Sequence, residues 1–185
     1  MQWGLVPSWL KDSAGSYKMI NARSETAHEK PAFKQALRAR RCILPASGFY
    51  EWEKVGRERV PHYIHLRDGD VMSMAGLWER WKSSAGEVLE SCTILTTVAN
   101  SLLKGLHDRM PVLLHGEAFD LWLDREIDDA SRLAELFLPY PSDRLQEYVV
   151  SKGVNTLGND DPGFILPAEP VREAHAFCCD SSANN

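Results

Sequence analysis

Residues 42 to 52 read CILPASGFYEW, two short apolar and aromatic runs separated by a proline, a serine and a glycine. Short runs of this kind, bounded by turn residues, are typical of β-strands. The pattern recurs along the chain. The strands that it predicts are Cys42–Leu44, Phe49–Glu53, His62–Leu66, Val71–Trp81, Val88–Val98, Met110–Leu114 and Gln146–Ser151. Because such strands follow one another across short connections, they predict an antiparallel sheet or a partial barrel.

Short helices are expected beside these strands. Pro31 suits the first turn of a helix. Phe33, Ala36 and Leu37 then share one face, which predicts an amphipathic helix that ends near Arg40. Further helical segments are expected at residues 100–104, 117–123 and 129–138. The predicted fold class is therefore α+β, a mainly antiparallel sheet or partial β-barrel with flanking short helices.

The length of 185 residues, 44% of them hydrophobic, fits one domain with a core of ordinary size. We expect this domain to span residues 1–167. The apolar periodicity is lost after Pro167, so residues 168–185 are predicted to form a flexible tail. The chain opens on apolar side chains with no preceding segment to pack against them, so we expect the domain to be incomplete at its N-terminus. These side chains are Trp3, Leu5, Val6 and Trp9.

The sequence shows no signal peptide. It also shows no apolar run of about 18 residues, which is the length that spans a membrane. This favours a cytoplasmic protein, nucleoid-associated if bacterial, with no membrane partner. The net charge is −5, but residues 1–60 carry 11 Lys/Arg against 6 Asp/Glu (+5) and residues 61–185 carry 10 against 20 (−10). Such a split either presents one basic face to phosphates or reflects scattered solvated charge.

The four cysteines show no paired CxxC spacing. Cys42 and Cys92 lie in apolar runs and are expected to be reduced core residues, because a free cysteine packs as a small hydrophobic side chain. Cys178 and Cys179 form a vicinal pair in the polar tail.

Six histidines are present, but their spacing does not indicate a metal centre. His62 and His65 are three residues apart on a predicted strand, so they face opposite sides of it. We therefore expect neither a metal ion nor a cofactor.

Glu51 lies between two aromatic residues on a predicted strand. Strand alternation points Tyr50 and Trp52 to one face. It places Glu51 on the other face with Phe49, where loss of hydration can raise the carboxyl pKa. A raised pKa suits a general acid or base near neutral pH, whereas the alternative is an ordinary exposed glutamate.

The segment HDRMP (residues 107–111) lies in a predicted turn before a strand, a location where binding and catalytic residues concentrate. His107 can transfer protons near pH 7, and Arg109 can hold a phosphate by two charge-assisted hydrogen bonds. Alternatively, Asp108 pairs with Arg109 in a structural turn.

Asn21 and Arg23 are two residues apart, so in an extended segment both side chains project to the same side. There the amide can bind a sugar or a carbonyl while the guanidinium binds a phosphate. The alternative is a loop that enters a helix, with Ser24 as N-cap and Glu25 in the first turn. Both interpretations can hold at once.

Tryptophans are more often core or rim residues than ligand-binding ones. Trp3 and Trp52 are the exceptions among the six, because each adjoins a polar motif. Each can offer an indole face to an unstacked base.

These motifs and others between them, in order from residue 3 to about residue 161, resemble the SOS-response-associated peptidase (SRAP) family of abasic-site-processing proteins. The long uninterrupted run from Phe33 to Trp52 makes chance similarity improbable. The matching stretches are WGLVPSW (3–9), INARSET (20–26), FKQALRARRCILPASGFYEW (33–52), GLW (76–78), ILTTVAN (94–100), HDRMPVLL (107–114) and VSKGVNTLGND (150–160).

The resemblance implies a sensor that recognises an abasic site in single-stranded DNA and traps it covalently, with self-processing peptidase and lyase-like activity in the DNA damage response. In the family, the nucleophile is an N-terminal cysteine that is exposed when the initiator methionine is removed. Its α-amine attacks the open-chain aldehyde to give a Schiff base, and its thiol then closes a thiazolidine ring.

Carried over by position, the resemblance assigns catalytic roles to three residues. Asn21 would orient the amine or the deoxyribose, Glu51 would transfer protons at the amine, and His107 would assist sugar ring opening and crosslink reversal. The residues implied in DNA binding are Arg23 and Arg109, for phosphates, and Trp3 and Trp52, for neighbouring bases. The expected partner is single-stranded DNA with abasic sites, bound by a monomer.

The sequence departs from the family pattern at its start, which is Met1-Gln2-Trp3 instead of Met-Cys-Gly-Arg. Because a thiazolidine needs the amine and the thiol on one residue, no internal cysteine can replace the missing nucleophile, and we expect this chain not to crosslink. One interpretation is a truncated or misassigned start of an ordinary member, which the apolar opening favours. The other is a shortened, noncovalent single-stranded DNA-binding module. A thiol peptidase acting on other proteins is a third interpretation, but it lacks a cysteine beside His107.

Overall fold

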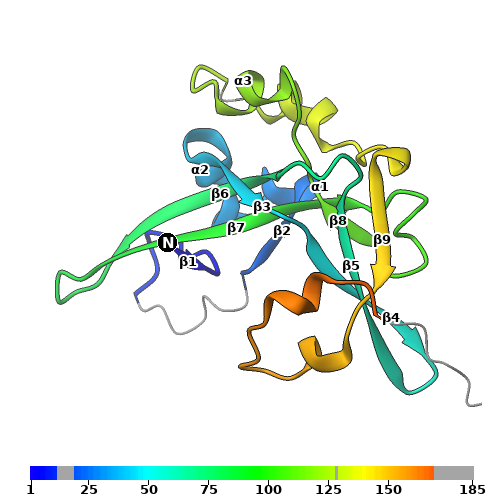
Figure 1. Cartoon of the computed structure of the whole chain (residues 1–185). Coiled ribbons are helices and arrows are strands. Elements are labelled where there is room, and N and C mark those ends of the chain that lie inside the picture. The colour runs from blue at the N-terminus through cyan, green and yellow to red at the C-terminus, as the bar shows by residue number, and fades with distance from the viewer. Residues whose placement is uncertain (12–18, 128, 169–185) are drawn as a thin grey trace, which may run out of the picture.

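Strand β7 (Val88–Val98) is paired along both edges in the larger of two sheets (Figure 1). One of its edges pairs antiparallel with β6 (Met72–Lys82) and then with β8 (Arg109–Pro111), and β3 (Arg41–Ala46) extends the sheet beyond β6. The predicted strands in this part of the chain are confirmed. The computed structural model describes residues 1–11, 19–127 and 129–168.

Two short strands, β1 (Gln2–Trp3) and β2 (Asn21–Arg23), pair parallel with the other edge of β7. Two or three residues are too few to show a strand period, so the sequence did not predict them as strands. Their registers place Trp3 opposite Cys92 and Asn21 opposite Ile94. The N-terminal motifs therefore lie along the same strand whose opposite edge carries β8.

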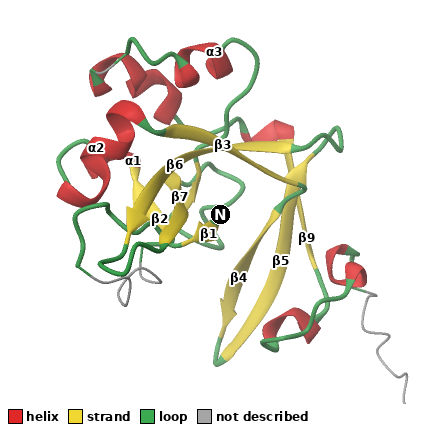
Figure 2. Cartoon of the chain, turned by 90° about the vertical axis from the view of Figure 1, so that its left-hand side faces the viewer, coloured by secondary structure: helices red, strands yellow, loops and turns green. Residues whose placement is uncertain are grey.

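The second sheet is antiparallel and contains β4 (Phe49–Val55), β5 (Glu58–Leu66) and β9 (Leu145–Val149). Figure 2 shows it beside the larger sheet. β5 begins earlier than predicted and includes Pro61. The Pro61 carbonyl accepts a hydrogen bond from the Val150 amide just beyond the end of β9, so the missing N–H of this proline faces an edge where the ladder stops.

The helices are short. α2 (Pro31–Ala39) ends at the predicted place and buries Phe33, Ala36 and Leu37, as its spacing predicts. α1 (Ser24–Ala27) directly follows β2. Figure 1 shows α2 and α3 (Ala118–Leu123) above the larger sheet. None of the helices in the described ranges is long and apolar enough to cross a membrane.

The segment predicted as a helix over residues 129–138 is a 3-10 helix, Ala130–Phe137, rather than an α-helix. Asp129 precedes it and accepts a hydrogen bond from the Ser131 amide, so the helix start is capped. The other 3-10 segments are Ser142–Arg144, Lys152–Asn155 and Pro162–Ile165.

The main core lies between the larger sheet and these helices. Trp122 is fully buried there, and its indole N–H donates to the Cys42 carbonyl at 2.9 Å. Leu5 and Val6 are fully buried, whereas Trp3 and Trp9 are 55% and 62% exposed, so the apolar opening of the chain is only half in the core. The curled larger sheet, the second antiparallel sheet and the few short helices confirm the predicted α+β class.

Cys42 is half-buried, Cys92 is buried, and both are free thiols, as predicted. Burial raises the pKa of Cys42 to about 12, so its thiol is protonated and unreactive at neutral pH. Cys178 and Cys179, with the predicted tail beyond residue 168, lie outside the described residues.

Asn100 organises the turn that leads from β7 to β8. The Lys104 amide donates to the Asn100 carbonyl at 3.0 Å, which confirms the predicted single helical turn. The buried Asn100 side chain donates to the Tyr140 carbonyl at 2.8 Å and accepts from the Leu103 amide at 3.1 Å. This turn holds the segment that contains His107.

We predict that Gly48→Ala destabilises the protein by about 1–3 kcal/mol, the usual cost of overpacking. A Cβ at position 48 would collide with the backbone oxygen of Ile64 and would lie 2.5 Å from Cζ of Tyr63. Urea unfolding would measure the loss. Gly105→Ala is the control, because its Cβ would meet nothing within 4 Å. Equal stability of the two variants would contradict the prediction.

Candidate functional site

A cavity of about 140 Å³ is lined by residues from both sheets. Five of its lining residues are ones that the sequence singled out: Trp3, Asn21, Glu51, His107 and Arg109. The structure therefore brings together residues from four separate motifs. The other lining residues are Phe49, Tyr50, Met74, Ile94, Thr96, Met110 and Pro111.

Asn21 reaches the cavity through the parallel pairing of β2 with β7. Ala22 is buried, whereas Asn21 and Arg23 are exposed on the opposite face, as their spacing predicts. Arg23 is paired with Thr96, a cavity residue, but is not itself part of the lining. The prediction of Ser24 as N-cap is wrong, because Arg23 occupies that position and makes no side-chain cap bond.

Glu51 is half-buried, and loss of hydration raises its carboxyl pKa. The charge of His107 opposes this shift and that of Asp108 adds to it. Tyr50 and Trp52 share the other face of β4, with ring centroids 6.3 Å apart. The predicted alternation of β4 and the predicted direction of the Glu51 shift are thus confirmed.

His107 has a defined hydrogen-bonding pattern in the turn before β8. Its Nδ1 accepts from the Arg109 amide at 2.9 Å. Nδ1 also lies 3.3 Å from the Arg109 carbonyl, so its role as donor or acceptor depends on which ring nitrogen is protonated. The ring is about half exposed, and its Nδ1 lies 3.2 Å from Oδ1 of Asp108.

Arg109 does not pair with Asp108, so that interpretation of the turn is wrong. Instead, Nη1 and Nη2 of Arg109 donate to the two carboxylate oxygens of Glu25 at 2.7 and 2.8 Å. Nη2 also donates to the Thr96 carbonyl at 2.5 Å. Glu25 and Thr96 were not predicted as site residues, although they lie in the motifs INARSET and ILTTVAN.

Trp3 and Trp52 are placed differently. Trp3 lines the cavity, and its indole N–H donates to the Ile20 carbonyl at 2.8 Å. Trp52 is not in the lining; its indole N–H donates to Oδ1 of Asn155 at 2.6 Å. This bond connects the GFYEW motif to the VNTLGND motif, 103 residues further along the chain.

His62 and His65 face opposite sides of β5, as predicted. Nδ1 of His62 lies 2.6 Å from Glu147 and its Nε2 lies 3.5 Å from Glu53. His65 stacks on Tyr63, with ring centroids 5.8 Å apart. Among the described residues, no group of three or more His, Cys, Asp or Glu side chains is arranged to hold a metal ion.

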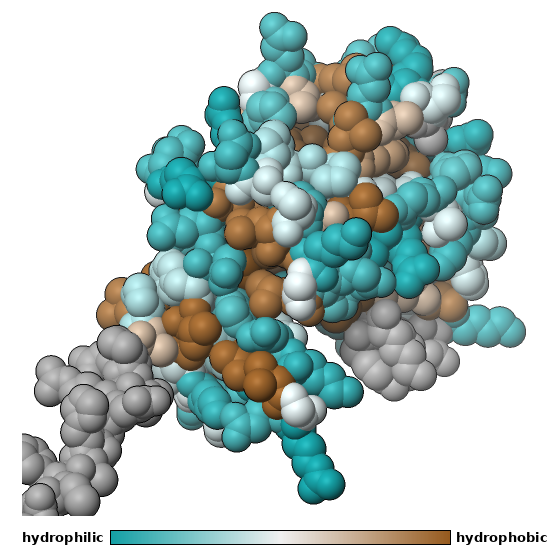
Figure 3. Space-filling model, turned by 90° about the vertical axis from the view of Figure 1, so that its right-hand side faces the viewer, coloured by the Kyte–Doolittle hydropathy of each residue, from teal (hydrophilic) through white to brown (hydrophobic). Residues whose placement is uncertain are grey.

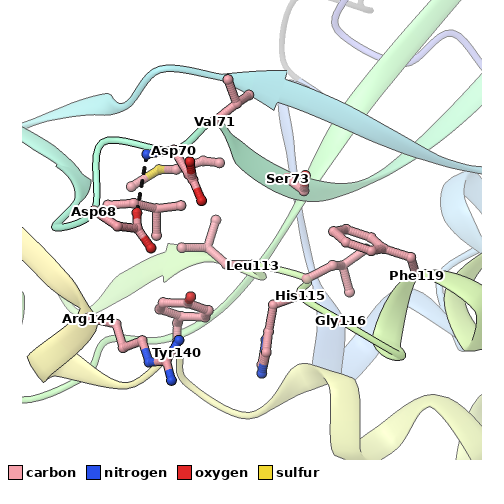
Figure 4. Close-up of a pocket in the computed structure, with 13 residues that line it drawn as sticks. Asp68, Asp70, Val71, Ser73, Leu113, His115, Gly116, Phe119, Tyr140 and Arg144 are labelled. Carbon is pink, nitrogen blue, oxygen red and sulfur yellow. Dashed lines mark hydrogen bonds between the residues drawn. The ribbon is translucent and has the colours of Figure 1, made fainter.

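A second cavity, of about 250 Å³, contains none of the residues that the sequence singled out. Figure 4 shows Asp68 and Asp70 on one side of it and His115, Tyr140 and Arg144 on the other. On the face of the molecule shown in Figure 3, apolar residues form separate groups between hydrophilic ones, as is common on protein surfaces.

Comparison with known proteins gives consistent matches. The family described as "SOS response associated peptidase (SRAP)" matches residues 1–157. The chain is 43% identical over 166 residues to the "Abasic site processing protein YoqW" of Bacillus subtilis (strain 168), and the match covers 89% of this chain and 74% of that protein. It is 34% identical over 185 residues to the "Abasic site processing protein HMCES" of Xenopus tropicalis, covering 88% of this chain and 55% of that protein.

A solved structure is also similar. The crystal structure of a protein from Bacteroides thetaiotaomicron superposes with a TM-score of 0.85 at 31% sequence identity. The match covers 90% of this chain and 75% of that one. The arrangement of the two sheets therefore recurs in an experimentally determined protein.

We predict that the Glu51 carboxyl titrates above its ordinary pKa, and that His107→Ala moves its pKa further upward, because the substitution removes a positive charge that stabilises the carboxylate. A ¹³C NMR titration of the glutamate side chains would measure both pKa values. Glu87→Gln, in the exposed turn before β7, should leave the titration of Glu51 unchanged. A Glu51 pKa at or below the ordinary carboxyl value would contradict the prediction.

Proposed function

The chain belongs to the SOS response associated peptidase (SRAP) family, and on this premise we propose that it processes abasic sites in single-stranded DNA as part of the DNA damage response. The observation that carries the proposal is the convergence of Asn21, Glu51 and His107 on one cavity from three separate elements. The relatives named as abasic site processing proteins support the substrate class.

The chemistry of an abasic site suits these three side chains. Its sugar exists partly as an open-chain aldehyde, which an amine attacks with loss of water to form an imine. Glu51, with its raised pKa, is matched to take a proton from the amine and return it to the departing hydroxyl. We propose that His107, in its imidazolium form, gives a proton to the ring oxygen as the sugar opens, while the proton of the anomeric hydroxyl passes to water. The Asn21 amide would orient the amine or the sugar.

Covalent capture requires a second step. In the chemistry that we propose, a thiol on the residue that supplies the amine adds to the imine carbon, and its proton passes to the nitrogen, which closes a thiazolidine. The described cysteines cannot supply this thiol, because neither Cys42 nor Cys92 lines the cavity. We therefore propose that crosslinking and self-processing belong to a form of the protein that carries a cysteine at its N-terminus, close to Trp3.

A second candidate function is noncovalent binding of single-stranded DNA. It is favoured by the exposure of Trp3 and Arg23, which can contact bases and phosphates without any thiol. In this case Trp3, Arg23 and Trp52 would contact bases and phosphates as in the first proposal, and Glu51 would transfer no proton.

A denaturing gel distinguishes the two candidates. We expect a heat-stable crosslink to single-stranded DNA with one abasic site only when the chain is extended upstream of Trp3 with the family's Met-Cys-Gly-Arg start. In that extended form, Glu51→Gln should slow crosslinking by about 10²-fold, the lower range for loss of a general acid or base. Glu87→Gln, remote from the cavity, should not.

The absence of a crosslink in both forms, with DNA binding retained, would leave noncovalent binding as the function. The absence of binding as well would overturn both candidates.

A further inference from the structure

Glu25 and Arg109 form a bidentate ion pair beside the cavity. Their nitrogen–oxygen distances are 2.7 and 2.8 Å, and the Arg109 side chain is only 15% exposed. The pair joins α1 to β8, and Nη2 also reaches the carbonyl of Thr96 on β7. One guanidinium thus ties together three elements that border the cavity.

These contacts occupy most of the donors of Arg109. A guanidinium has five N–H groups, and three of them point to Glu25 and Thr96. The Nε atom is buried and has no hydrogen-bond partner among the described residues. One N–H on Nη1 remains for a ligand. Arg109 therefore cannot bind a phosphate through two hydrogen bonds while it is paired with Glu25.

The charge of Arg109 is also compensated. The hydrogen bond from Arg109 is the main cause of the lowered pKa of Glu25, so this carboxyl stays ionised at neutral pH. The pair therefore has no net charge. The charge of Arg23 also lowers the pKa of Glu25, but less than Arg109 does. Arg23 is exposed, and no carboxylate lies within 4 Å of its guanidinium in the described parts of the chain.

We propose that Glu25 is a positioning residue, which fixes Arg109 in the cavity wall and cancels its charge, so that Arg109 offers one directed N–H to the nucleotide while Arg23 supplies the net charge that binds phosphate. The proposal rests on the proposed function, since it assigns roles within the same DNA site. It gives the two arginines different tasks, although both were expected to bind phosphates alike.

The salt dependence of DNA binding tests the proposal. Each phosphate neutralised on single-stranded DNA contributes about −0.7 to the slope of log K against log salt concentration. Glu25→Gln releases the charge of Arg109, so we expect its slope to be steeper than that of the unmodified chain by about 0.7. Arg23→Gln should make the slope shallower by a similar amount. Fluorescence anisotropy with a labelled abasic strand would measure both, and it needs no crosslinking step.

Glu29→Gln is the matched control. It also removes one negative charge, four residues along the chain, but Glu29 is 69% exposed and its ion-pair contact is with His28. Its slope should equal that of the unmodified chain. In the double variant Glu25→Gln/Arg109→Gln the slope should return to the unmodified value, because both charges of the pair are removed.

The possible results are distinct. If the unmodified chain binds abasic single-stranded DNA but Glu25→Gln leaves the slope unchanged, the charge of Arg109 is not compensated by Glu25 and the inference is wrong. If Glu25→Gln and Glu29→Gln steepen the slope equally, the effect is one of overall charge, which also overturns it. If the unmodified chain does not bind the strand, the proposed function fails first and this inference fails with it.

Discussion

Backbone hydrogen bonding along both edges of β7 is the constraint on which the rest of the structure depends. A strand offers donors and acceptors on both sides, and in a folded interior these must be paired. β6 and β8 satisfy one edge, and the short β1 and β2 satisfy the other. Because Thr96 is paired on one side with Arg23 and on the other with Pro111, two distant motifs are held about one strand spacing from the same residue.

The sequence predicted those features that depend on local periodicity. The alternation of residues 49 to 53 predicted Glu51 on the face opposite Tyr50 and Trp52, and the structure confirms this. The strands Val71–Trp81 and Val88–Val98 appear nearly at their predicted bounds. Strand β2 could not be predicted from the sequence, because three residues are too few to reveal a period. Its pairing partner also lies more than 70 residues away along the chain.

The ion pairs show the same limit. Asp108 and Arg109 are neighbours in sequence, which suggested a pair, but Arg109 lies in β8 and binds Glu25, 84 residues away. Adjacent residues of an extended segment point to opposite faces, whereas strand pairing can bring remote ones together. The family resemblance identified five of the residues that line the cavity, but the partner of Arg109 became visible only in three dimensions.

The edge of β5 has a further consequence. β5 extends past the end of β9, which leaves part of one edge without a strand partner, and such edges can recruit strands from other molecules. At this edge Pro61 lacks a backbone N–H, so one donor is missing. The Arg59 carbonyl is occupied, because it accepts a hydrogen bond from the Asn155 side chain at 3.3 Å. Lys152 lies beside the same segment and forms an ion pair with Glu58 at 2.6 Å. The part of β5 that extends past β9 is thus a poor template for a strand of another molecule, and this edge of the hairpin is protected against edge-to-edge aggregation.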